Sequence, residues 1–73
     1  NEVPQDYVRA SEFYHQAAKQ GLALAHYLLG LLYLTGKGVQ KDEEKAKQWL
    51  KKAAGQGLSE AQSKLDDIEL AED

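Results

Sequence analysis

The chain has 73 residues, and its nine basic and twelve acidic residues give a net charge of -3. A domain of this size buries only about 60% of the surface that its unfolded chain exposes, so its apolar residues must be well patterned or be covered by further repeats. The lack of cysteine excludes disulfides, thiolate metal sites and cysteine nucleophiles, and it leaves the redox compartment open. The acidic balance argues against nucleic acid or an anionic membrane as the main partner.

The longest apolar-rich run is too short to cross a bilayer. It covers residues 22–34, is interrupted by His26 and Gly30, and falls short of the roughly 20 residues that a span needs. We therefore expect a soluble chain without membrane insertion, with both a cytoplasmic and a bacterial periplasmic or secreted location open. The chain begins at Asn1 without a methionine or a signal-like segment, so we expect a processed form or an excised part of a longer protein.

The first expected helix follows Asp6, whose carboxylate is suited to an N-cap, and stops at Gly21, which can adopt positive φ. Pro4 lies ahead of the first hydrogen-bonded turn, where it can only help the helix to begin. Apolar residues at i, i+3, i+4, i+7 and i+8 form one continuous helical stripe. This stripe consists of Ala10, Phe13, Tyr14, Ala17 and Ala18.

A second helix is expected over about residues 23–35, only a residue or two later, which makes it an antiparallel neighbour. Its inward stripe is formed by Ala25, Leu29, Leu32 and Tyr33. The segment TGKGVQK, residues 35–41, then predicts a tight reversal at Gly36 and Gly38. Its GKG lacks the glycine spacing, the Lys-Ser/Thr pair and the preceding strand of a phosphate-binding loop.

The third helix, residues 42–56, is predicted to begin at the N-cap Asp42 and to stop at Gly57. Trp49 and Phe13 share a register, so we expect both to fill spaces between helix layers. The stripe of this helix consists of Ala46, Trp49, Leu50, Ala53 and Ala54.

The fourth helix, about residues 59–71, carries Ala61, Leu65 and Ile68 as its inward stripe. Asp66 and Glu69 replace the apolar or small residues found one period earlier, which is typical of a terminal helix that no further repeat covers. At the other end the chain opens on the second helix of a unit, so we expect an exposed apolar edge there.

The four helices form an internal repeat. The stretch Val3–Leu29 recurs as Val39–Leu65, 36 residues later, with ten identities over 27 aligned positions. A period in the mid-thirties with helical patterning indicates an all-α solenoid of stacked, antiparallel helix pairs.

The run from Ala25 to Gly57 closely resembles the unit of the Sel-one-like repeat family, relatives of the tetratricopeptide repeats. The matching positions are Ala25, Leu29, Gly30, Tyr33, Gly36, Gly38, Val39, Asp42, Lys45, Ala46, Trp49, Lys52, Ala53, Ala54 and Gly57. The resemblance implies a right-handed α/α solenoid whose members serve as scaffolds and adaptors in protein complexes, in bacteria and in eukaryotes. Leu24 and Leu28 depart from the pattern, which has polar residues there. We expect one domain over residues 1–73, with a partial unit at 3–21, a full unit at 22–57 and a degenerate capping unit at 58–73.

No pattern indicates catalysis, a metal site or a cofactor, and the signature residues of the resembling family are structural. His15 and His26 lack a metal-ligand spacing and are expected on the surface. The carboxylates serve better as caps or as a polar end than as a catalytic pair, which needs a dry pocket. Six lysines lie between Lys37 and Lys52, and their helical members are expected to point away from Trp49 as a solvated face.

One helix is more apolar than its inward stripe requires. The other side of the 23–35 helix is apolar too, and a helix that is hydrophobic nearly all round is normally buried all round. The residues concerned are Leu24, Tyr27, Leu28, Leu31 and Leu34. They form either a groove for a partner peptide or helix, on the concave surface that first helices line in related solenoids, or a surface that neighbouring helices cover.

The sequence therefore predicts a non-enzymatic scaffold or adaptor that binds a peptide, helix or domain on its concave surface. Self-association through the apolar helix face or the open amino-terminal edge stays possible, and nucleic acid is not an expected partner. The alternative is an accessory regulatory domain of a larger enzyme or of a secreted multi-repeat protein.

Overall fold

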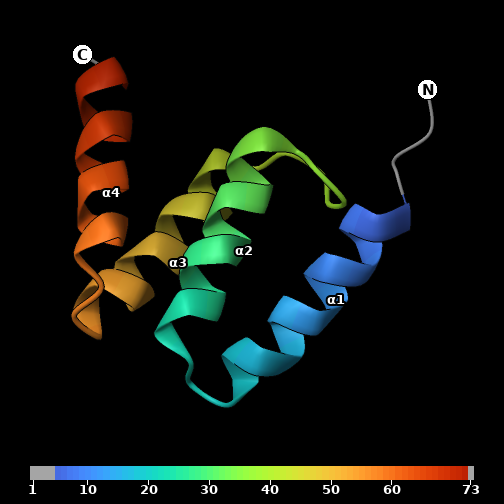
Figure 1. The fold of residues 1–73 in the computed structure, drawn as a ribbon. Helices are drawn as coiled ribbons and strands as arrows, with labels where there is room; N and C mark the ends of the chain where they lie inside the picture. Colours follow the sequence, from blue (N-terminus) through green and yellow to red (C-terminus); the bar gives the residue numbers. More distant parts are fainter. Residues whose placement is uncertain (1–4, 73) are drawn as a thin grey trace.

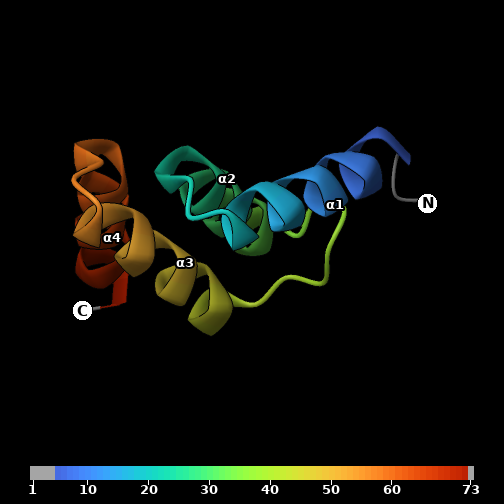
Figure 2. The same cartoon turned by 90° about the horizontal axis from the view of Figure 1, so that it is seen from below.

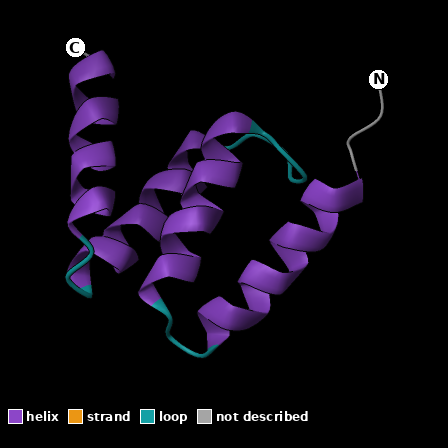
Figure 3. Cartoon of the chain, in the orientation of Figure 1, coloured by secondary structure: helices purple, strands orange, loops and turns teal. Residues whose placement is uncertain are grey.

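The computed structural model describes residues 5–72. They form four helices, α1 (Gln5–Lys19), α2 (Ala23–Thr35), α3 (Glu43–Gly55) and α4 (Ser59–Glu72), and this part of the chain contains no strand (Figure 3). Consecutive helices reverse direction, with α1 at one end and α4 at the other (Figures 1 and 2). The predicted all-α class and the four helices are confirmed.

The body is flat, with extents of 32 × 30 × 15 Å. Its centre is the contact between α2 and α3, the most extensive contact between helices in the described region. Leu29 of α2 and Leu50 of α3 are its largest fully buried side chains. Gly30 permits the close approach, because a β-carbon there would lie 2.7 Å from Leu50 Cγ.

Two core clusters flank this centre. One joins α1 to α2 through Ala18, Ala25 and Leu29. The other joins α3 to α4, and its members are Leu50, Ala53, Ala61, Leu65 and Ile68. The inward residues predicted for the fourth helix are therefore buried, while Asp66 and Glu69 of α4 are exposed to solvent.

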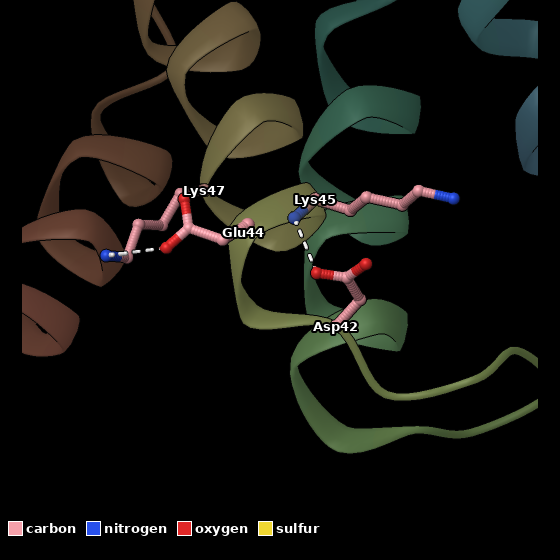
Figure 4. A network of polar contacts seen from close by, with 4 residues as sticks. All are labelled: Asp42, Glu44, Lys45 and Lys47. Atoms are coloured by element: carbon pink, nitrogen blue, oxygen red, sulfur yellow. Dashed lines mark hydrogen bonds and ion pairs between the residues drawn. The ribbon is translucent and has the colours of Figure 1, made fainter.

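The predicted helix ends hold, with one exception. Asp42 is the N-cap of α3 and accepts a hydrogen bond of 3.1 Å from the Lys45 amide (Figure 4). Gly21 and Gly57 follow α1 and α3 with φ of 82° and 96°. The prediction for Asp6 was wrong, because it lies inside the first turn of α1. The predictions for Val3 and Pro4 concern positions outside the described residues.

The loop after α2 turns back through Gly36 and Gly38, whose φ angles are 76° and 77°. The Asp42 amide donates to the Tyr33 carbonyl at 2.9 Å and closes the loop against α2. A β-carbon on Gly38 would collide with the backbone carbonyl of Tyr7 in α1. The glycine is therefore needed both for its φ and for the contact that holds the loop against α1.

Candidate partner-binding surfaces

An apolar groove, here called the α1–α2 groove, runs between the first two helices. One part has a volume of about 370 Å³ and is lined by Tyr7, Ala10, Tyr14, Leu28, Leu31, Leu32, Thr35 and Lys37. A second part of about 120 Å³ is lined by Phe13, Tyr14, Ala17, Leu22, Leu24, Ala25 and Leu28. Tyr14 and Leu28 belong to both parts, so the two hollows form one apolar strip.

The strip leaves large side chains open to solvent. Phe13 is 66% exposed, Leu24 is 58% exposed and Leu22 is 52% exposed. Contiguous exposed apolar side chains of this kind mark interaction surfaces on soluble proteins. The prediction that Phe13 fills a space between layers was wrong.

The five residues proposed from sequence as a partner surface divide between two sides of α2. Leu24, Leu28 and Leu31 lie together in the α1–α2 groove. Tyr27 and Leu34 pack instead against the cluster that joins α3 to α4. The separation follows from helix geometry, because consecutive residues are about 100° apart around an α-helix, so a helix apolar all round faces several neighbours.

The internal repeat relates residues that line the α1–α2 groove to positions of α3. A shift of 36 residues places Phe13 of α1 on Trp49 of α3, and it places Ala10 and Tyr14 on Ala46 and Leu50. On α3 these positions are covered: Ala46 and Leu50 are fully buried, and both lie against Gly30 of α2. The equivalent residues of α1, Ala10 and Tyr14, are half-buried and line the α1–α2 groove.

The opposite side of α2 carries a polar aromatic cluster that the sequence did not predict. His26 is only 7% exposed, stacks on Trp49 with ring centroids 5.4 Å apart, and pairs through Nδ1 with Gln56 Oε1 at 2.8 Å. Gln56 Nε2 donates to the Gly21 carbonyl, so the Gln56 oxygen faces His26 and the Nδ1–H is the donor. This link joins the turn after α1 to the turn after α3, and the expectation of a surface His26 was wrong.

His15 extends the cluster toward α1. Its Nε2 lies 3.2 Å from the Tyr33 hydroxyl, and its ring meets Trp49 edge to face at 5.7 Å. Neither histidine could be placed from sequence, because no local spacing reveals a contact between residues more than 15 positions apart. The recurrence of Gln20 as Gln56 was the one available signal.

The lysines of α3 also differ from expectation. Lys52 Nζ lies 5.0 Å from the centre of the Trp49 ring, and Lys45 Nζ lies 5.5 Å from that of Tyr33. Lys47 extends to the other side of α3, where it pairs with Glu44 at 3.8 Å (Figure 4). The prediction that the helical lysines point away from Trp49 was therefore wrong for Lys52.

Within residues 5–72, no group of three or more His, Cys, Asp or Glu side chains is arranged to hold a metal ion. In the same range, no helix combines the length and the apolar character needed to cross a membrane.

Comparison with known proteins agrees with this architecture. The family model of the Sel1 repeat matches residues 1–22 and 23–58. The chain thus belongs to the Sel1 repeat family, the Sel-one-like family that its signature residues resemble. Repeats of this family are non-catalytic modules that mediate protein–protein interactions.

Two relatives are similar over most of the chain. An uncharacterized protein of Neisseria meningitidis serogroup B is 39% identical over 66 residues, which cover 90% of this chain and 14% of that protein. Chitin synthase regulatory factor 3 of Schizosaccharomyces pombe is 35% identical over 69 residues, or 94% of this chain and 7% of that protein. The chain therefore spans a small part of either relative. No solved structure matches.

Proposed function

We propose that this chain is a scaffold or adaptor module that binds an apolar helix in the α1–α2 groove. The observation that carries the proposal is the contrast between two equivalent faces. On α3, Ala46 and Leu50 are fully buried and lie against α2, whereas their equivalents on α1, Ala10 and Tyr14, are only half-buried and line the groove. An apolar helix with small residues at its contact points, as Gly30 is in α2, fits such a face.

In this proposal Leu24, Leu28 and Leu31 form the α2 wall of the groove. They lie at i, i+4 and i+7, which places them on one side of the helix. In this proposal the chain divides into units at residues 3–21, 22–57 and 58–73, and α1 of the first unit receives the partner helix.

The test uses the double variant Leu24→Gln/Leu28→Gln. Leu24 is largely exposed and Leu28 half-buried, so the variant should lose no more than about 1.5 kcal/mol of unfolding free energy. The probe is a synthetic peptide of residues 22–38, with three lysines added at each end for solubility. Its titration into labelled protein should shift amide signals of α1 and α2, and the variant should weaken binding at least tenfold, about 1.4 kcal/mol.

Leu34→Gln is the matched control, because Leu34 packs against the α3–α4 cluster. It should lower the unfolding free energy by about 1–3 kcal/mol through a buried amide without partners, while peptide affinity stays unchanged at a temperature where the variant is folded. Equal binding by the Leu24/Leu28 variant, or signal changes spread over α4, would refute the groove.

A second function is an accessory regulatory domain of a larger protein. The S. pombe relative, which carries the matching segment in 7% of its length, is a regulatory factor by name. A catalytic domain adjoining this segment in the full-length protein would favour the accessory role, and further repeats would favour the scaffold.

A further inference from the structure

A second groove lies on the other side of α2 and shares no residue with the α1–α2 groove. It is called here the basic aromatic groove and consists of two adjoining hollows. The first, of about 210 Å³, is lined by His15, Tyr33, Lys45, Gln48, Trp49 and Lys52. The second, of about 430 Å³, is lined by Tyr33, Val39, Gln40, Lys41, Asp42 and Lys45. Tyr33 and Lys45 border both hollows, which makes the groove continuous.

The floor of the groove is held by contacts on several sides. Tyr33 and Trp49 are half-buried against the core cluster of Ala18, Ala25 and Leu29. The Tyr33 hydroxyl is 3.2 Å from His15 Nε2, and the Trp49 ring is held between His15 at 5.7 Å and His26 at 5.4 Å. The two rings are therefore held in position before a ligand binds, which lowers the entropic cost of binding. Lys45 and Lys52, whose Nζ atoms lie 5.5 and 5.0 Å from the centres of the Tyr33 and Trp49 rings, must turn from the rings toward the ligand.

The rim of the groove is positively charged. Lys41, Lys45 and Lys52 border it, and within residues 5–72 none of the three makes an ion pair. The one carboxylate of the lining is Asp42, which already caps α3 by accepting from the Lys45 amide. The acidic residues Glu60, Asp66, Asp67 and Glu69 lie on α4, at the end of the molecule away from α1 (Figure 1).

We propose that the basic aromatic groove binds an acidic peptide segment of a partner protein, with carboxylates on Lys45 and Lys52 and an apolar or aromatic side chain against Tyr33 and Trp49. Lys45 and Lys52 are seven residues apart on α3, so their Cα atoms are separated by about 10 Å along the helix axis. Carboxylates three residues apart lie on one side of a polyproline II segment and have nearly the same spacing, at about 3.1 Å per residue.

The net charge of the whole chain favours a peptide over nucleic acid. Nucleic acid presents a long row of phosphates, and its binding depends on many cationic contacts. A chain with a net charge of -3 would repel many of these phosphates. A short acidic peptide meets only the local field of the groove, where three lysines outnumber one carboxylate.

The test uses the chain's single tryptophan, Trp49, as the reporter. A twelve-residue synthetic peptide that repeats Glu-Phe-Ser, without Trp or Tyr, places its Glu residues three apart and is titrated into the protein while Trp49 emission is followed. We expect a saturable change that weakens as salt is raised, and none with the same peptide carrying Gln in place of Glu. In Lys45→Gln/Lys52→Gln the affinity should fall about tenfold, as expected for the loss of two solvent-accessible charge pairs.

Lys51→Gln/Lys64→Gln is the matched control, since it removes the same charge from residues outside the groove, and its affinity should stay within about twofold of the parent. The substituted lysines are not part of the core, so melting curves should show all variants folded. The proposal fails if the Gln peptide binds equally, if the Lys45/Lys52 variant keeps its affinity, or if no saturable change occurs. Tighter binding of a twelve-nucleotide single-stranded DNA, lost in the same variant, would also overturn it. Because the Leu24/Leu28 variant leaves this groove intact, the two proposals fail separately.

Discussion

Trp49 and Phe13 occupy the same register of the repeat in different surroundings. Trp49 is half-buried between two histidines and packs against the cluster of Ala18, Ala25 and Leu29. Phe13 is 66% exposed. Its ring contact is Tyr14 of the same helix, with centroids 6.0 Å apart. The same position in the repeat therefore supports the core in α3 and lies in an exposed apolar surface in α1.

The two aromatic residues should respond differently to truncation. Trp49→Ala should lower the unfolding free energy by about 3 kcal/mol, because it removes packing and leaves a cavity at the junction of three helices. Phe13→Ala should cost less than about 1 kcal/mol, since most of its ring is already in water. Urea unfolding of both variants measures the difference. Equal losses would mean that Phe13 is covered in solution, as self-association would make it.

The contact between α2 and α3 depends on Gly30, which the repeat replaces by Asp66 in the exposed part of α4. In a helix interior, Gly→Ala normally stabilises by about 1 kcal/mol. At Gly30 the added β-carbon would lie 2.7 Å from Leu50 Cγ and 3.2 Å from the Ala46 carbonyl oxygen. The two helices would have to move apart, so Gly30→Ala should destabilise the protein.

Gly55 at the end of α3 is the matched control, because its φ is not positive and no atom lies within 4 Å of an added β-carbon. Gly55→Ala should be neutral or stabilise by up to about 1 kcal/mol. Thermal melts of the two variants should thus move in opposite directions. Stabilisation by Gly30→Ala would show that the helices adjust to the extra methyl group without losing contact.

At the level of individual helices, most of the fold could be predicted from the sequence. Periodicity and caps predicted four helices whose ends lie within two residues of the observed ones, because these signals are local. Contacts across the chain could not be read in the same way. The pairing of His26 with Gln56 depends on how the turns meet, and the division of Leu24, Leu28 and Leu31 from Tyr27 and Leu34 depends on where α1 and α4 pack on α2.

Across the whole molecule, stability should decrease from the centre toward the ends. Each repeat in a solenoid contacts only its neighbours, so an end helix is supported on one side. Leu29 and Leu50 are fully buried at the α2–α3 contact, while α1 leaves Phe13 open and α4 leaves Leu70 exposed. We therefore expect the end helices to open locally without unfolding of the centre.

Hydrogen exchange read by mass spectrometry tests this gradient. Amides of α2 and α3 should exchange most slowly, with α1 and α4 opening at lower free energy. Adding the residue 22–38 peptide should then slow exchange in α1 more than in α4, because a ligand stabilises the conformation to which it binds, by about 2.7 kcal/mol at a hundred times its dissociation constant. The Leu24→Gln/Leu28→Gln variant serves as the control and should lose this protection. Equal protection of both end helices would mean that the peptide associates nonspecifically with apolar surface and does not bind in the α1–α2 groove.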